Sequence, residues 1–165
     1  MPALRRATLP VLLLLVAVTV LVGCTRGEPD IAVSPAQAGA PAAGSSQVVV
    51  EIRNSGEGDD TLLGASTPAA AGVEMHLTEV TDGRASMRQQ ETVAVPSGDT
   101  VRFRPGGLHL MLVVPDESVV VGGTFELTLH FERSGDRTIP VEVVSLLDLA
   151  EDAFDQPAPE PGADD

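Results

Sequence analysis

TFELTLHFE, residues 124–132, alternates apolar and polar side chains with a period of two residues. Successive side chains of a strand point to opposite faces, so this stretch has one apolar and one polar face. The apolar face carries Phe125, Leu127, Leu129 and Phe131. His130 falls on the polar face beside two glutamates, which indicates a surface histidine and not a ligand. The pattern is typical of a sheet with a core on one side and water on the other.

Similar short apolar runs, separated by turn residues, continue from residue 47 to residue 145. The candidate strands are residues 48–54, 61–66, 73–81, 84–95, 100–104, 107–114, 124–132 and 137–144. Breaks such as SGEGDD, TDGR, PSGD and RSGD have the composition of turns. No run of ten or more residues has a helical period. The sequence therefore predicts an all-β domain over residues 47–146, an antiparallel Greek-key β-sandwich.

The two ends of the chain differ from this domain. Residues 1–23 combine an arginine-containing start with an uncharged apolar run over residues 11–22, which predicts a signal peptide. The run ends at Leu21-Val22-Gly23-Cys24, which resembles the lipobox of bacterial lipoproteins, where the cysteine is lipidated. A signal anchor with a stray cysteine is the alternative. We expect an extracytoplasmic protein, lipid-anchored to the cell membrane through Cys24.

Two further segments are expected to lack structure. Residues 24–46, rich in Ala, Pro and Gly, are interpreted as the lipidated cysteine and a flexible tether with a reach of about 25 Å. Residues 147–165 form an acidic tail that we expect to be disordered.

Charge and cysteine content exclude several functions. The formal net charge of −14 disfavours nucleic acid as a partner, since such a surface repels phosphate. Cys24 is the only cysteine, so the domain has neither a disulfide nor a thiolate ligand. A blue-copper electron-transfer site, which requires a thiolate, is excluded for the same reason.

Residues 108–112 (LHLML) put three leucines on one face and turn His109 and Met111 together to the other. In residues 73–77 (VEMHL) the same alternation assigns the odd positions to the core and turns His76 away from it.

Thr81-Asp82-Gly83-Arg84 predicts a two-residue hairpin turn, for which Asp-Gly is a strong signal. Pairing Thr81 with Arg84 places Met87 opposite Thr78, diagonal to His76 on the same face. Diagonal neighbours lie about 7–8 Å apart, close enough for long side chains to share one ion.

Two segments thus each present one histidine and one methionine on a non-core face. The sequence after Cys24 has three methionines and three histidines, and four of these six fall in this set. Methionine is usually core filler, so alternation alone leaves a metal site and ordinary packing equally open.

The spacing of His76, Met87, His109 and Met111 is H-x10-M-x21-H-x-M, which resembles the PCuAC-type periplasmic copper chaperones. The flanking VEMH at residues 73–76, VPSGDTV at 95–101 and RPGGLHLML at 104–112 are similar to that family as well. The resemblance implies a cupredoxin-like sandwich that binds one Cu(I) through these four residues. It also implies copper delivery to a client, the CuA centre of cytochrome c oxidase, with copper donors, the oxidase or its assembly factors as partners.

Two departures from the family pattern are visible. Residues 31–37 lack the family's early tryptophan, which weighs against an N-terminal strand, and the tail lacks the His/Met enrichment of a second copper site.

Two other functions remain open: a copper buffering or resistance lipoprotein, and a metal-free adhesion or scaffold lipoprotein. An enzyme is not expected, because no nucleophile–base pair or spaced carboxylate pair is visible.

Overall fold

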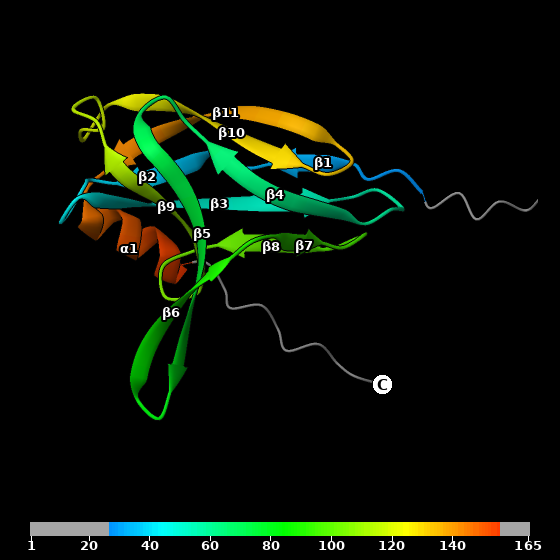
Figure 1. The fold of residues 1–165 in the computed structure, drawn as a ribbon, viewed down its shortest axis with the longest axis horizontal. Coiled ribbons are helices and arrows are strands. Elements are labelled where there is room, and N and C mark those ends of the chain that lie inside the picture. The colour runs from blue at the N-terminus through cyan, green and yellow to red at the C-terminus, as the bar shows by residue number, and fades with distance from the viewer. Residues whose placement is uncertain (1–26, 156–165) are drawn as a thin grey trace, which may run out of the picture.

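Eleven strands and one short helix make up the described part of the chain, residues 27–155 of a computed structural model (Figure 1). The elements in chain order are β1 (Ile31–Val33), β2 (Ala36–Gly39), β3 (Ser45–Asn54), β4 (Asp60–Ser66), β5 (Ala70–Thr81), β6 (Arg84–Gln90), β7 (Val93–Val95), β8 (Thr100–Phe103), β9 (Leu108–Pro115), β10 (Thr124–Phe131), β11 (Gly135–Val144) and α1 (Leu146–Asp155). The predicted all-β class is confirmed.

The strands follow the order β6-β5-β9-β3-β2-β11-β10-β4-β7, and β1 and β8 pair with β3. The first half of β3 pairs with β2 and β9, and its second half pairs with β1 and β8. One long strand therefore takes part in both layers of the fold. Every ladder is antiparallel except β2–β11, which is parallel. The predicted antiparallel sandwich thus contains one parallel pair.

The core lies between the layers and is built almost entirely from aliphatic and phenylalanine side chains. In β10 the four apolar positions predicted from alternation are all buried, and Leu127 and Leu129 are fully so. From β3 the core receives Val48, Val50 and Ile52. Alternation identified these residues because only one face of each strand contacts the other layer.

Residues 84–95, predicted as one strand, form two strands that belong to different parts of the sheet. β6 pairs with β5, whereas β7 pairs with β4 at the other end of the strand order. Glu91 and Thr92 between them are exposed and leave the ladder. The strand propensity was continuous, but tertiary pairing divided the segment.

The predicted flexible tether, residues 24–46, is partly wrong, because β1 and β2 lie within it. Ala36 and Ala38 of β2 are buried between β3 and β11. A Cβ on Gly39 would lie 2.7 Å from Leu146 Cδ2, which is closer than real contacts allow. The small residues that suggested a linker therefore lie in a packed strand. β1 also forms without the tryptophan whose absence weighed against a strand there.

The predicted disorder over residues 147–165 is wrong for its first part, where α1 forms. Ser145 caps the helix: its Oγ accepts a hydrogen bond from the backbone N–H of Asp148 at 3.2 Å. Leu149 is buried and contacts the Gly39 position of β2. The Ser-x-x-Asp spacing at residues 145–148 was a capping signal that could have predicted this helix.

The predicted signal peptide, Cys24 and residues 156–165 lie outside the described residues. Among residues 27–155, no helix has the length and apolar character needed to cross a membrane.

Asp60 is a buried carboxylate that joins β4 to the β10–β11 turn. It accepts hydrogen bonds from the backbone N–H groups of Thr61, Arg133 and Ser134, at 2.8 to 3.0 Å. Burial raises the pKa of Asp60, but the hydrogen bonds to its carboxylate outweigh burial and hold the pKa below its ordinary value.

Asn54, fully buried at the end of β3, connects three further segments. Its Oδ1 accepts the N–H groups of Asp30 and Gly56, and its Nδ2 donates to the carbonyls of Gly58 and Val95. The side chain therefore satisfies four backbone groups at the end of the sandwich where the described chain begins.

Replacing Asn54 with Ala should lower the free energy of unfolding by about 3 kcal/mol, because buried backbone groups lose their partners. Chemical denaturation followed by circular dichroism measures this change. Ser55→Ala, at an exposed neighbour, should change stability by less than about 0.5 kcal/mol. Equal stability of Asn54→Ala and the parent would contradict the structural role given to Asn54.

Candidate metal centre

The hairpin of β5 and β6 has the register predicted from sequence. Thr81 pairs with Arg84, and Thr78 pairs with Met87. Asp82 and Gly83 have φ of 51° and 74°, as a two-residue turn with two left-handed positions requires. The hairpin projects from the body of the sandwich in Figure 1, with β6 at the edge of the sheet.

The β5–β9 ladder brings together residues that are far apart in the chain. His76 pairs directly with His109, and Glu74 pairs with Met111. Met111 is therefore diagonal to His76 on one side, as Met87 is on the other. Since paired residues share a face, all four side chains predicted as ligands lie on one face of three adjacent strands, β6, β5 and β9.

Burial differs sharply among the four residues. His109 is fully buried and His76 is 8% exposed, whereas Met87 is 53% exposed and Met111 is half-buried. The two imidazole rings stack edge to face, with centroids 5.8 Å apart and an angle of 80° between the rings. The sequence placed both histidines away from the core. They do lie on that face, but the rings themselves are shielded from water.

Each imidazole has one nitrogen occupied and one free. His109 Nδ1 lies 2.9 Å from the carbonyl oxygen of Gly107, and His76 Nε2 lies 3.0 Å from Glu74 Oε2. Carbonyl and carboxylate oxygens accept hydrogen bonds, so these two nitrogens carry the protons when the rings are neutral. The lone pairs then lie on His76 Nδ1 and His109 Nε2.

Both of these nitrogens are buried and have no hydrogen-bond partner among the described residues. A buried, unsatisfied imidazole nitrogen costs about 1–3 kcal/mol, and two on adjacent residues call for an explanation. A shared metal ion would satisfy both lone pairs. The arrangement of an oxygen acceptor on one nitrogen and a free lone pair on the other is typical of metal-binding histidines.

The surrounding side chains restrict the kind of metal. Within residues 27–155, no group of three or more His, Cys, Asp or Glu side chains is placed to hold an ion. Two imidazoles with two thioethers form an uncharged donor set that suits a soft monovalent ion.

The structure also contains a hydrogen-bonded chain that the sequence did not suggest. Ser66 Oγ lies 2.8 Å from His130 Nε2, and His130 Nδ1 lies 2.8 Å from Asp136 Oδ1. A nucleophile–base pair therefore exists, contrary to the expectation from sequence. All three groups are exposed on the outer face of β4, β10 and β11, where water competes for each bond. The two hydrogen bonds connect three strands, and His130 lies on the polar face as predicted.

Comparisons with known proteins agree with this architecture. Residues 29–143 match the model of a family described as "Putative lipoprotein LpqE-like". "Putative lipoprotein Lxx21020" of Leifsonia xyli subsp. xyli (strain CTCB07) is 30% identical over 122 residues, covering 72% of each chain.

Solved structures of PCuAC domains share the fold. The copper-bound PCuAC domain from PmoF2 is 26% identical, with a TM-score of 0.59 over 70% of this chain and 92% of that one. The solution structure of Cu(I)-bound DR1885 from Deinococcus radiodurans has a TM-score of 0.57 at 23% identity, over 68% of this chain and 77% of that one, a likeness of fold alone.

The assignment of nitrogens predicts a specific NMR signature. Without metal, His76 should carry its proton on Nε2 and His109 on Nδ1, and Cu(I) should shift the two other nitrogens in long-range ¹H–¹⁵N spectra. In Glu74→Ala, His76 should lose its fixed tautomer while His109 keeps its own. Cu(I) affinity should then fall roughly 10–100-fold.

Glu79→Ala provides the control on the same strand, because Glu79 is exposed and faces Arg88 at 3.8 Å. It should leave both the spectra and the affinity unchanged. A Cu(I)-dependent shift at His76 Nε2 or His109 Nδ1 would contradict the assignment.

Proposed function

The chain belongs to the LpqE-like lipoprotein family, and from this premise we propose that it is an extracytoplasmic copper chaperone carrying one Cu(I). The proposed ligands are His76, Met87, His109 and Met111. The observation that carries the proposal is the pair of buried, unpartnered imidazole nitrogens, with a thioether diagonal to His76 on either side. The PCuAC domain from PmoF2 provides independent support, since it has this fold and binds copper.

The donor chemistry favours Cu(I) over other ions. Thioether sulfur is soft, uncharged and has no proton to lose, so it binds Cu(I) well and hard cations poorly. Zinc prefers thiolates or additional imidazoles, and calcium requires six or more oxygens. A neutral set of four donors also stabilises the +1 ion relative to +2, because it adds no negative charge.

The gradient of burial fits a carrier. His76 and His109 hold the ion from the protein side, where water has little access. Met87 lies on the edge strand and is more than half exposed, so an incoming donor can replace it without disturbing the core. We therefore assign Met87 as the first ligand that a partner's donor replaces during transfer. The two imidazoles are the last ligands to release the copper.

We propose that the client is a membrane protein, cytochrome c oxidase, whose CuA centre receives the copper. We also propose that the chaperone reaches this client while it is anchored to the membrane by lipid on Cys24. Extracytoplasmic location agrees with the lipoprotein names of the family and of the relative. Copper donor proteins and oxidase assembly factors are the other proposed partners. The proposed role is transport and not catalysis.

The ligand set predicts one tightly bound Cu(I) per chain and strong loss on replacing methionine. Met87→Leu and Met111→Leu each keep size and hydrophobicity, so the fold should be nearly unchanged. Cu(I) affinity, measured against a competing chelator, should nevertheless fall at least tenfold in each and by orders of magnitude in the double variant. Lower pH should weaken binding in every variant, because protons compete with copper for imidazole nitrogen.

Met75→Leu is the matched control, because Met75 is 4% exposed in the core and faces away from the site. It should bind Cu(I) like the parent. X-ray absorption should detect sulfur and nitrogen around copper in the parent. A double Met87/Met111 variant that binds as tightly as the parent would make these methionines packing residues and defeat the proposal.

Copper delivery to cytochrome c oxidase predicts that a strain without this protein has an oxidase defect. A deletion strain grown at limiting copper should assemble less CuA, measured by its absorbance and by oxidase activity. The parent and Met75→Leu should restore it, while the double Met87/Met111 variant should not. Normal oxidase together with copper sensitivity in the deletion strain would instead indicate a buffering protein.

A further inference from the structure

The first described residues are attached to the end of the sandwich away from α1, at the right of Figure 1. Arg133 Nη2 donates to the carbonyl oxygen of Gly27 at 2.8 Å. The carbonyl oxygen of Glu28 accepts the N–H groups of Glu57 and Gly58, at 3.1 and 3.3 Å. We call residues 27–30 the strap, because they lie along the β3–β4 turn before β1 begins.

Three glycines allow this contact. A Cβ on Gly58 would collide with the carbonyl oxygen of Gly27, and a Cβ on Gly56 would collide with that of Glu28. Gly27 itself leaves no room for a side chain against Glu57. The strap and the turn are therefore fitted backbone to backbone, and the chain at Gly27 has a fixed position on the domain.

We propose that the strap holds the domain on the membrane by this end, in one orientation. The copper face, which is the side of β6, β5 and β9 that carries the four proposed ligands, is then held at a distance from the bilayer. The proposal rests on the lipid attachment at Cys24 proposed above. Cys24 precedes Gly27 by three residues, which span at most about 11 Å. A flexible tether of twenty or more residues would let the domain reorient freely above the membrane. The short connection from Cys24 to Gly27 instead keeps the end carrying Gly27 at the bilayer surface.

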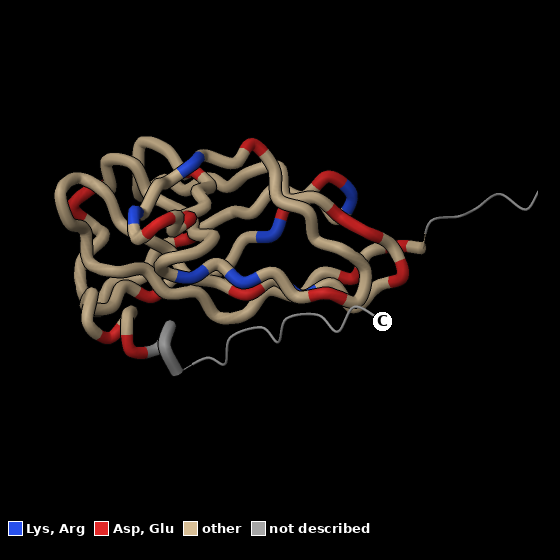
Figure 2. Tube along the Cα trace, turned by 90° about the horizontal axis from the view of Figure 1, so that it is seen from below, with Lys and Arg blue, Asp and Glu red and all other residues tan. Residues whose placement is uncertain are grey.

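The orientation follows from the covalent connection and not from electrostatic attraction. Figure 2 shows acidic residues at the end where the described chain begins. Those near the strap and its adjoining turns are Glu28, Asp30, Glu57, Asp59, Asp99 and Glu132. Anionic lipid would repel this end, so the domain stands on the surface without inserting into it.

The orientation sets the height at which copper is presented. Asp30 N–H donates to Asn54 at the last residue of β3, and Met111 pairs with Gln47 near its start. Asn54 follows Gln47 by seven positions along β3, which is about 23 Å at roughly 3.3 Å per residue. The copper face therefore lies some 20–30 Å above the anchored end. It fits a membrane-bound acceptor whose own site projects from the bilayer by a similar distance.

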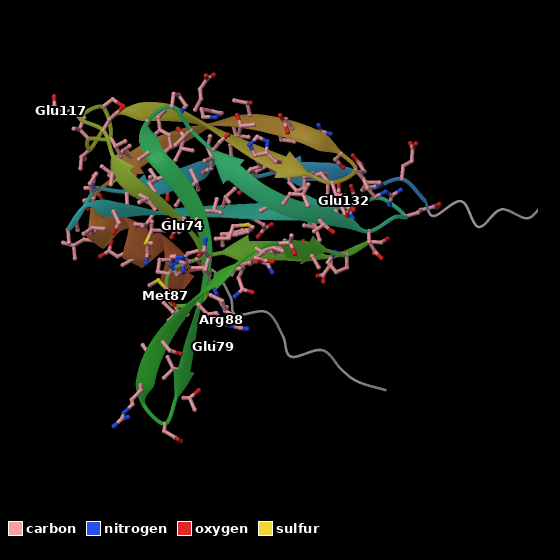
Figure 3. All side chains as sticks on the ribbon, viewed as in Figure 1. Glu74, Glu79, Met87, Arg88, Glu117 and Glu132 are labelled. Carbon is pink, nitrogen blue, oxygen red and sulfur yellow. The ribbon has the colours of Figure 1, made fainter. Side chains whose placement is uncertain are left out.

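Tryptophan fluorescence can test this orientation, because the chain has no Trp or Tyr. Glu132→Trp and Glu117→Trp are a matched pair of exposed sites at opposite ends of the domain, both labelled in Figure 3. The full-length lipidated proteins are reconstituted into phosphatidylcholine vesicles containing a lipid with a spin-labelled headgroup. The spin label should quench the fluorescence of Glu132→Trp at least several-fold more than that of Glu117→Trp.

Two variants test the contribution of the strap separately from that of the lipid anchor. A twenty-residue Gly-Ser insertion between Arg26 and Gly27 should equalise the quenching while the protein still sediments with vesicles. Gly58→Ala should reduce the difference by displacing the strap, whereas Gly72→Ala, in open space, should not. Equal quenching at both positions without the insertion would overturn the fixed orientation. A parent protein that does not sediment with vesicles would instead refute the lipid anchor, and with it the present inference.

Discussion

His76 lies directly opposite His109 in the β5–β9 ladder, and the candidate metal centre depends on this register. A slip of one residue would send one imidazole to the core face, because side chains alternate along a strand. The register is locked from the other face, where Met75 pairs with Leu110 and both are buried. The hydrophobic core therefore fixes the geometry of the polar site, and the diagonal positions of Met87 and Met111 follow from the same pairing.

The proposed site has two buried donors and one that is open to water. Glu74 and the Gly107 carbonyl orient the two rings from outside the proposed coordination shell, so that one lone pair of each is directed into a dry space. Met87 lies at the water-exposed edge of the same face. A storage site would enclose all four donors, whereas a carrier needs one donor that a partner can replace. In the proposed chaperone, Met87 on the edge strand β6 is that donor, and its exchange leaves the core closed.

Amino-acid composition was a poor guide at both ends of the domain. Ala- and Gly-rich sequence before residue 46 suggested a flexible linker, yet Ala38 is fully buried and Gly39 lies close to Leu146 and Leu149. Acidic sequence after residue 146 suggested disorder, yet a capped helix forms and buries Leu149. Small residues indicate both flexibility and close packing, and only the neighbouring strands decide between the two.

The sequence by itself determined most strands between residues 47 and 145, which side of those strands faces the core, and which face carries the two histidines and two methionines. These properties depend on a period of two residues and on one Asp-Gly turn, which are local. The meeting of His76 with His109, thirty-three residues away, followed from sequence only through family resemblance, since no local rule sets the pairing of distant strands. Burial of the rings, the free nitrogens, the division of residues 84–95 and the strap at Gly27 were decided by tertiary structure. Each of these depends on atoms contributed by segments far apart in the chain, whose approach is fixed only when both layers pack around a common core.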